Sequence, residues 1–352
     1  LPIYTMMDIP YWSMIPAFTK AGRERESLSA LGRSCAGVGS AIISIITVLS
    51  VSAIGKAFAA SDASKKIIER TGFQYFALAV AVLFFVFTLI TCLCIKEKST
   101  VDVKTNSVKE MFSALVKNDQ AMTMVIAIVL INTALYITSN LVIYFFKYDF
   151  SGPEKWEAHY TLFNTFGGGF QILAMMILFP LFRKFFNTMK LFYVCFVMAM
   201  LGYLILLGIA FINTTEVNLL LVPAFLIMSA IGMLNVIVTI FLSNTVDYGQ
   251  FKNGSRDESV IFSMQTFVVK LASGLSALIA SIVLSVFHIS QNQEDAVMQI
   301  ASDSSRMGLR LSMTILPILV LLIAIVIFKK NYILTDEKLE EIQKKISASS
   351  AS

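Results

Sequence analysis

Charged residues are scarce in this chain. Asp, Glu, Lys and Arg make up 14% of its 352 residues, whereas a soluble protein carries roughly 25%. A soluble surface with so little charge would consist of apolar patches and would aggregate, and disordered or collagen-like chains have other compositions. Hydrophobic residues make up 57%, and the mean hydropathy is +0.75. The composition therefore predicts an all-α, polytopic membrane protein embedded in the lipid bilayer.

Histidine and cysteine are also rare, which argues against metal and disulfide chemistry. The chain has two histidines, His159 and His288, and no HExxH motif, so we expect no zinc site. Cys92 and Cys94 lie two positions apart and would point to different sides of a helix. The chain begins at Leu1 without a basic region and a cleavage site, so no signal peptide is visible, and we expect residues upstream. We predict no resident cofactor.

Apolar runs long enough for membrane helices recur along the whole chain. A transmembrane helix needs about 20 mostly apolar residues, and nine segments reach or approach this length. The longest connection contains an amphipathic stretch, 108–116, that is either a short helix on the membrane surface or a flexible linker. The nine segments are 1–19, 31–55, 73–95, 121–146, 159–182, 191–212, 217–248, 259–289 and 307–328.

The distribution of Lys and Arg predicts the orientation of the chain. Alternate connections, starting with the first and including the C-terminal tail, carry more than twice as many Lys and Arg residues as the others, so the C-terminus is predicted to be cytoplasmic. The net charge of +5 is then a topology signal, and no nucleic-acid partner is needed to explain it. Nine spans would leave the N-terminus outside, whereas three further spans would give twelve with both ends inside.

The twelve-span hypothesis divides the chain into four regions. Residues 1–95 would be the remainder of an N-terminal helix bundle, and 96–120 a cytoplasmic middle loop. Residues 121–330 would form a C-terminal six-helix bundle, and 331–352 a cytoplasmic tail.

Three ionisable residues, Asp8, Arg33 and Lys270, lie within apolar segments. Each would cost roughly 2.5–3.5 kcal/mol at a helix centre, so each must pair, face a water-filled cavity or reach the membrane surface. Lys270 lies deep in its segment, which favours a polar cavity. Arg33 lies near a segment start, where its side chain could instead reach the interface.

The neighbours of Asp8 favour a sugar as ligand. Tyr4, Thr5 and Trp12 lie at −4, −3 and +4 from Asp8 and share its helix face. Sugars present hydroxyl groups to carboxylates and apolar C–H faces to aromatic rings. The alternative for Trp12 is an aromatic residue at the membrane interface.

Polar residues also gather near Lys270. Ser263, Thr266 and Ser273 share its helix face, and Gln265 lies close to it, which indicates a hydrated stripe with one cation. The small residues could instead serve helix packing alone.

Each of two further patterns allows two interpretations. Segment 121–146 carries Asn and Tyr residues at four-residue spacing, from Asn132 to Tyr144, which suits either interhelical hydrogen bonds or pore lining. The mixed charges at 23–26 (RERE) and around Asp247 and Lys252 could form ion pairs that hold an inner gate closed, or could be ordinary solvated loop charges.

Several of these motifs resemble one transporter family. The runs 7–13 (MDIPYWS) with Pro16, 23–26 (RERE), 118–120 (NDQ), 246–249 (VDYG) and 263–270 (SMQTFVVK) are similar to motifs of the glycoside–pentoside–hexuronide cation symporters, which have the major facilitator fold. The resemblance spans essentially the whole chain, and MDIPYW–RERE and QTFVVK are its most specific parts.

The resemblance implies roles for individual residues. Asp8 would accept hydrogen bonds from sugar hydroxyls, Trp12 would stack on the sugar ring, and Arg33 would donate to the sugar. Thr5 would help to hold the coupling cation, Na⁺ or H⁺, together with acids on helices outside this chain. The implied substrate-binding residues are Tyr4, Asp8, Trp12, Arg33, Gln265, Thr266, Val269 and Lys270.

We therefore expect a symporter that couples uptake of a glycoside to Na⁺ or H⁺ by alternating access. The glycoside would be a melibiose-like oligosaccharide or a related pentoside or hexuronide. Where a member of this family has a second pocket tryptophan, this chain has Asn235, a departure that bears on which sugar binds. The expected location is the inner membrane of a bacterium, with a cytoplasmic regulatory protein as a further partner. The alternatives are a transporter of lipids or other solutes with the same fold, and an intramembrane enzyme acting on lipids or isoprenoids.

Overall fold

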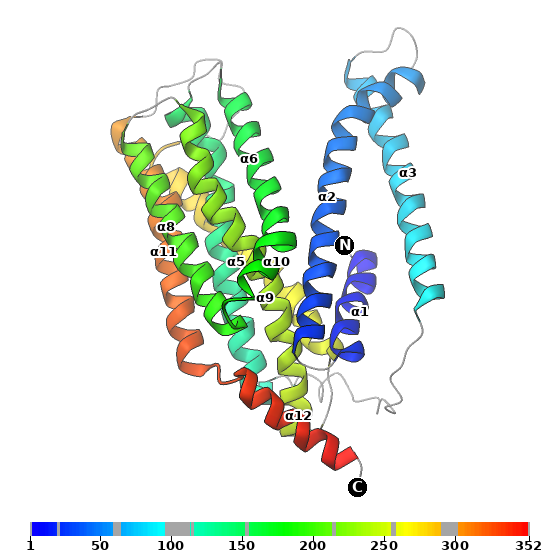
Figure 1. Ribbon diagram of the computed structural model, residues 1–352. Coiled ribbons are helices and arrows are strands. Elements are labelled where there is room, and N and C mark those ends of the chain that lie inside the picture. Colours follow the sequence, from blue (N-terminus) through cyan, green and yellow to red (C-terminus); the bar gives the residue numbers. More distant parts are fainter. Residues whose placement is uncertain are drawn as a thin grey trace. The chain divides into compact units, whose positions relative to one another are not determined.

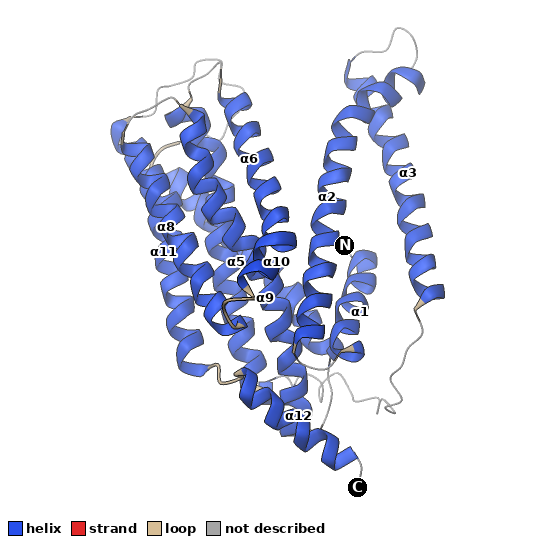
Figure 2. Cartoon of the chain, in the orientation of Figure 1, coloured by secondary structure: helices blue, strands red, loops and turns tan. Residues whose placement is uncertain are grey.

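The computed structural model describes the protein as an all-helical chain (Figure 2). Helices dominate because a bilayer offers no water to backbone N–H and C=O groups, so each apolar segment must satisfy them internally. No strand occurs in the described ranges. These ranges are 2–19, 22–58, 65–95, 113, 116–151, 155–212, 216–254, 258–289 and 302–350.

The predicted surface stretch 108–116 lies almost entirely outside these ranges. The chain forms two compact units, one made of residues 1–33 with 103–352 and the other of residues 34–102. The predicted region boundaries at 95, 120 and 330 stay predictions.

The first three helices cover the first three predicted segments. Helix α1 contains two prolines, Pro10 and Pro16. In the second unit, α2 and α3 approach closely at Gly55 and Gly72, because a Cβ atom at either glycine would overlap a backbone carbonyl of the other helix. The bounds are α1 Pro2–Phe18, α2 Arg23–Phe58 and α3 Lys65–Cys94.

The remaining long helices run side by side within the first unit (Figure 1). Helix α9 packs against α6 and α8, and α5 packs against α10 and α11. The elements are α5 Asp119–Phe145, η1 Phe146–Phe150, α6 Trp156–Leu173, η2 Ala174–Leu178, α7 Phe179–Phe182, α8 Thr188–Phe211, η3 Val217–Leu220, α9 Leu221–Asn253, α10 Glu258–Val286 and α11 Asp303–Asn331.

Helix α9 is the central helix of this unit. In its most apolar window, 78% of the residues are buried inside the protein. Gly232 permits the close approach of α6, since a Cβ atom there would overlap the backbone carbonyl of Gln171. A helix buried on all sides positions its polar residues against several neighbours at once, and this property matters for the site described below.

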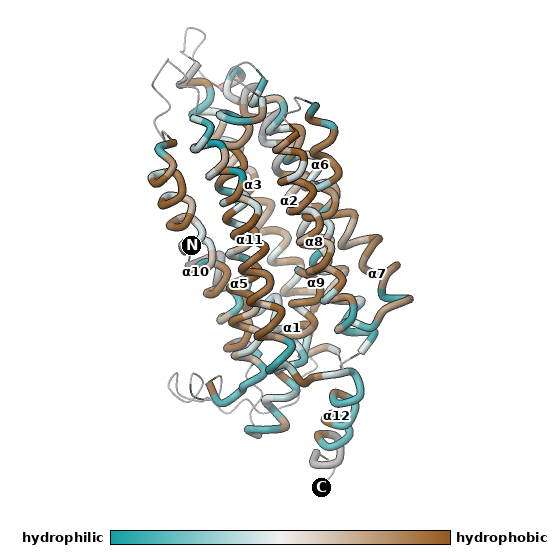
Figure 3. Tube along the Cα trace, turned by 90° about the vertical axis from the view of Figure 1, so that its left-hand side faces the viewer, coloured by the Kyte–Doolittle hydropathy of each residue, from teal (hydrophilic) through white to brown (hydrophobic). Residues whose placement is uncertain are grey.

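Helix α12, Asp336–Ser350, follows the last long helix and is amphipathic. It packs against α9 through the buried side chains of Leu339 and Ile342. The ammonium group of Lys345 lies 5.5 Å from the ring centroid of Phe251. Figure 3 shows the difference in hydropathy: the long helices are mainly apolar, whereas α12 is mainly hydrophilic.

Seven helices of the described chain are long and apolar enough to cross a membrane. They correspond to seven of the nine predicted segments. Helices α1 and α2 cover the other two segments but are not among the seven. The predicted class, an all-α polytopic membrane protein, is confirmed, and Leu, Ile and Phe side chains on the outer faces of these helices are exposed to the surroundings of the protein.

Candidate functional site

The predicted pair on α1 forms in the structure. Trp12 Nε1 donates a hydrogen bond of 2.9 Å to Asp8 Oδ1, because residues four apart lie on one helix face. The Trp12 ring packs against α2, where a Cβ atom at Gly32 would lie 3.4 Å from it. The carboxylate and the aromatic ring are therefore held in one orientation.

Arg33 of α2 lies directly over Trp12. Its guanidinium carbon is 3.8 Å from the centroid of the Trp12 ring, which is the geometry of a cation–π contact. Arg33 Nε also donates a 2.8 Å hydrogen bond to Thr239 Oγ1 on α9. The Thr239 hydroxyl in turn donates to the carbonyl of Asn235, at 2.9 Å.

Helix α10 completes the site. The hydroxyl of Thr266 lies 3.4 Å from Asp8 Oδ2 and equally far from the carbonyl of Phe262 in its own helix, so its hydrogen is shared between two acceptors. Gln265 and Val269 are half-buried, and Lys270 is exposed.

Four helices thus meet at one cluster, defined here as the α1 cluster: Asp8, Trp12, Arg33, Thr239 and Thr266. Four of its members were predicted from the sequence. The side chains of Tyr4 and Thr5 lie outside the described residues. Thr239 was missed, although a hydroxyl four residues after Asn235 in an apolar helix was a signal that could have identified it.

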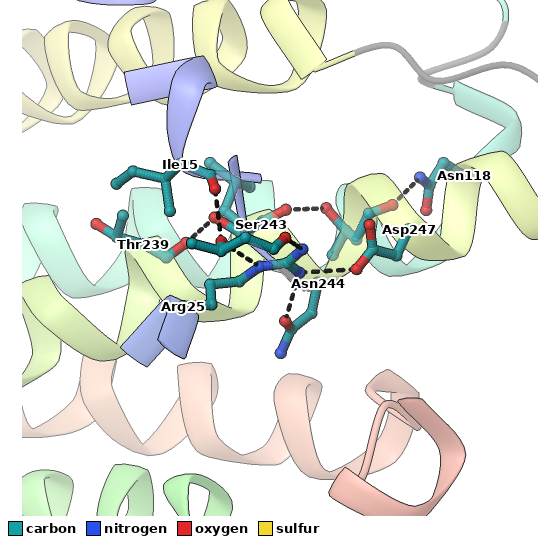
Figure 4. A network of polar contacts seen from close by, with 10 residues as sticks. Ile15, Arg25, Asn118, Thr239, Ser243, Asn244 and Asp247 are labelled. Atoms are coloured by element: carbon teal, nitrogen blue, oxygen red, sulfur yellow. Dashed lines mark hydrogen bonds and ion pairs between the residues drawn. The ribbon is translucent and has the colours of Figure 1, made fainter. Parts of the chain in front are cut away.

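A second polar cluster, the arginine network, lies where α2 begins (Figure 4). Arg25 is 1% exposed. Its Nη1 atom donates to Asp247 Oδ2 at 2.8 Å and to Asn244 Oδ1 at 3.1 Å. Its Nη2 atom donates to the carbonyl of Thr19, also at 2.8 Å. The network therefore joins the α1–α2 junction to the end of α9.

A neighbouring ion pair joins α2 to a different part of the chain. Arg183 donates two hydrogen bonds to the Glu26 carboxylate, of 2.7 and 2.8 Å, which is the strong bidentate arrangement. Thr188 at the start of α8 donates to the same carboxylate at 2.8 Å. Asp336, the first residue of α12, lies 4.0 Å from Arg183.

The start of α5 is tied to α9 as well. Asn118 caps α5 by accepting from the backbone N–H of Ala121, and its side-chain amide donates to the carbonyl of Thr245 at 2.8 Å. The next residue, Asp119, forms an ion pair with Lys252. Of the two interpretations of the mixed charges, ion pairing therefore holds for Arg25, Glu26, Asp247 and Lys252.

Two Asn residues of α5 have different partners. Asn140 Nδ2 lies 3.4 Å from Ser276 Oγ on α10, whereas Asn132 donates to the carbonyl of Ile128 within its own helix.

One buried ion pair was not anticipated. Arg310 of α11 donates two 2.6 Å hydrogen bonds to Asp149 in η1, and the Asp149 side chain is completely buried. It links the end of α5 to α11.

The comparisons with known proteins agree with this architecture. The sequence profile of the family described as MFS/sugar transport protein matches residues 2–336. The lactose permease of Lactobacillus delbrueckii subsp. bulgaricus is 30% identical over 96% of this chain and 52% of its own length. The raffinose carrier protein of Pediococcus pentosaceus is 29% identical over 96% and 51%. The isoprimeverose transporter of Lactiplantibacillus pentosus is 25% identical over 80% and 56%.

The chain spans about half the length of these curated relatives. The matching profile covers nearly all of the chain, and the helical architecture fits a membrane transporter. The chain therefore belongs to the MFS/sugar transport protein family, in the glycoside–pentoside–hexuronide group of the major facilitator superfamily.

Proposed function

We propose that the protein couples uptake of a glycoside to Na⁺ or H⁺ by alternating access. The observation that carries this proposal is the α1 cluster, in which a carboxylate, an indole ring and a guanidinium converge between apolar helices. These groups suit a sugar ligand, because sugar hydroxyls bind to carboxylates and guanidinium groups and the C–H faces of a sugar bind to aromatic rings. The relatives described above, a lactose permease and a raffinose carrier protein, support the substrate class.

The ion pairs near the C-terminal end of α9 and at Arg183 support the alternating-access part of the proposal. Arg25 with Asp247, and Glu26 with Arg183, join parts of the chain that the sequence assigns to opposite halves of a major facilitator protein. Such transporters work by rocking one half against the other around a central site. Both ion pairs would have to break for the cytoplasmic side to open, so they would act as its gate.

Cation coupling is proposed from the family resemblance. Thr5 would contribute to the cation site, and Lys270 would lie near its carboxylates. Sugar and cation would then strengthen each other's binding, typically by about 1–3 kcal/mol. The location in a bacterial inner membrane, the cytoplasmic C-terminus and a cytoplasmic regulatory protein as partner are parts of the same proposal.

Transport assays on the full-length protein in proteoliposomes test the proposal. We expect counterflow of labelled lactose, raffinose or isoprimeverose without chemical change, and faster accumulation when a Na⁺ or H⁺ gradient is imposed. Chemical conversion of the label would favour an intramembrane enzyme. Failure to exchange any of the three sugars, or related glycosides, would favour a transporter of lipids or another solute.

A further inference from the structure

The Trp12 ring is inaccessible in this structure. Trp12 is 7% exposed, and the guanidinium of Arg33 lies 3.8 Å from the centroid of its ring. Tyr11 meets the same ring edge-on, with centroids 5.1 Å apart. A sugar stacked on an aromatic ring needs a similar distance to a ring face, so sugar and guanidinium would exclude each other on the face that Arg33 covers.

Thr239 holds Arg33 in this position. Its hydroxyl hydrogen is directed to the carbonyl of Asn235, so its oxygen acts as an acceptor toward Arg33 Nε, at 2.8 Å. Thr239 is fully buried on α9, which limits the directions that the hydroxyl can take. The guanidinium is therefore fixed by a hydrogen bond at Nε and by the indole ring below it.

The carboxylate of the cluster is similarly engaged by the protein. Asp8 Oδ1 accepts from the Trp12 indole, and Thr266 lies within hydrogen-bonding distance of Oδ2. The groups that would recognise a sugar thus bind to one another, and a sugar would have to replace these internal contacts.

We propose that Thr239 is a positioning residue that holds Arg33 against Trp12 and so closes the sugar site on itself. An arriving glycoside displaces the guanidinium from the indole face, and Arg33 then donates to sugar hydroxyls. The inference rests on the proposed glycoside transport. The site can bind a sugar only in molecules in which Arg33 has moved away from Trp12. The apparent affinity for the sugar is therefore the intrinsic affinity multiplied by the fraction of such molecules. The displacement also breaks a contact between α2 and α9, which would link sugar binding to movement of these helices.

The test replaces Thr239 in the full-length protein, in a background in which Trp156 and every tryptophan outside this chain are changed to Phe, so that Trp12 is the single tryptophan. Thr239→Val removes the acceptor with nearly the same shape, and Thr239→Ser is the matched control that keeps it. We expect Thr239→Val to bind the glycoside about threefold to tenfold more tightly than Thr239→Ser. Without sugar, acrylamide should quench Trp12 more strongly in Thr239→Val, and its emission should shift toward that of the sugar-bound protein with Thr239 intact.

The outcomes separate this inference from the proposed function. If the protein with Thr239 intact binds no glycoside, the proposed function fails. If it binds glycoside, but Thr239→Val shows equal or weaker affinity or unchanged quenching of Trp12, Arg33 does not compete with the sugar, and the inference alone fails. Equal thermal unfolding of the two variants excludes misfolding as the cause of a difference.

Discussion

At the scale of single residues, the charges of Arg25 and Asp247 are buried together as an ion pair. Arg25 is 1% exposed, and the Asp247 side chain beside it is 5% exposed. Such a pair gains Coulomb energy in a low-dielectric interior but loses hydration, so its net contribution is small. Removal of one partner destabilises the protein, because it leaves a buried charge uncompensated.

We therefore expect Asp247→Ala to destabilise the protein strongly, by about 3–5 kcal/mol, the usual cost of breaking a buried pair. Thermal unfolding in detergent measures this change. Arg23→Ala is the control, since Arg23 is exposed in the same turn as Arg25 and should change stability little. The combined variant Arg25→Met with Asp247→Leu should recover part of the loss. Equal melting of Asp247→Ala and the unmodified protein would contradict the ion-pair role.

Trp12 provides a second prediction at the residue scale. Trp12→Ala should weaken glycoside binding by roughly 1–3 kcal/mol, because the sugar loses its aromatic platform, and Trp12→Tyr should keep part of the affinity. Equilibrium binding of labelled glycoside to the purified protein measures the effect. Unchanged binding by Trp12→Ala, at matched abundance, would leave Trp12 a packing residue.

At the scale of elements, the centre of the unit depends on how closely α9 approaches α6. The contact needs a glycine at 232, because the carbonyl of Gln171 occupies the place of a Cβ atom. Gly208 of α8 makes a useful comparison, since a Cβ atom there would meet nothing within 4 Å.

Gly232→Ala should therefore destabilise the protein by about 1–3 kcal/mol, the usual range for overpacking. Gly208→Ala should be neutral or slightly stabilising, because alanine favours a helix over glycine. Thermal unfolding of both variants in the same detergent tests the pair. Similar melting temperatures for the two would show that α6 and α9 can separate at little cost.

Helix α12 has an electrostatic contribution of its own. Hydrogen bonds from Lys338 and Lys345 lower the pKa of Glu341 from 4.5 to about 2. A carboxyl whose folded pKa is depressed stabilises the helix above its ordinary pKa, and the contribution is lost as the pH falls through about 2.

Glu341→Gln should thus raise hydrogen exchange in α12 at pH 7 by about twofold, as expected for exposed pairs three and four residues apart. The difference should shrink in 1 M salt, because exposed charges are screened. Glu337→Gln is the control on the same helix. An effect that salt does not change would indicate a cause other than these ion pairs.

At the scale of the whole molecule, the helices long enough to span a membrane and the family match both identify a membrane protein of the sugar transport family. The α1 cluster and the arginine network both involve α2 and α9, near Thr239 and near Asp247 respectively. The two clusters are also linked along α9, where the Ser243 hydroxyl donates to the carbonyl of Thr239. If the proposed sugar site and gate are correct, this stretch of α9 would connect them.

Lys270 carries the prediction about ion coupling. Lys270→Ala should abolish cation-coupled accumulation and leave membrane insertion intact, because the carboxylates of the cation site would lose a compensating charge. Lys270→Arg should restore activity only in part, since a planar fork replaces a compact charge. Sugar accumulation with and without a Na⁺ or H⁺ gradient measures this. The control is Lys184→Ala, at an exposed loop position. Normal coupled accumulation by Lys270→Ala would exclude Lys270 from the site.

Local sequence determined the helices and the composition of one helix face. Apolar runs of membrane length predict helices wherever they occur, because the bilayer forces internal hydrogen bonding. The pairing of Asp8 with Trp12 follows from a spacing of four, which every α-helix brings onto one face. The family followed from short motifs such as MDIPYW and QTFVVK, and it was confirmed by the comparisons.

Tertiary structure alone decided which groups satisfy the charges. Arg33 and Thr239 are 206 residues apart, and Arg310 and Asp149 are 161 apart, so no periodicity along the chain relates them. Their contacts depend on how α9 and α11 are rotated and on which small residues let them approach their neighbours. The sequence predicted Trp12 as a platform for sugar, but only the packing of α2 against α1 and α9 placed a guanidinium on it.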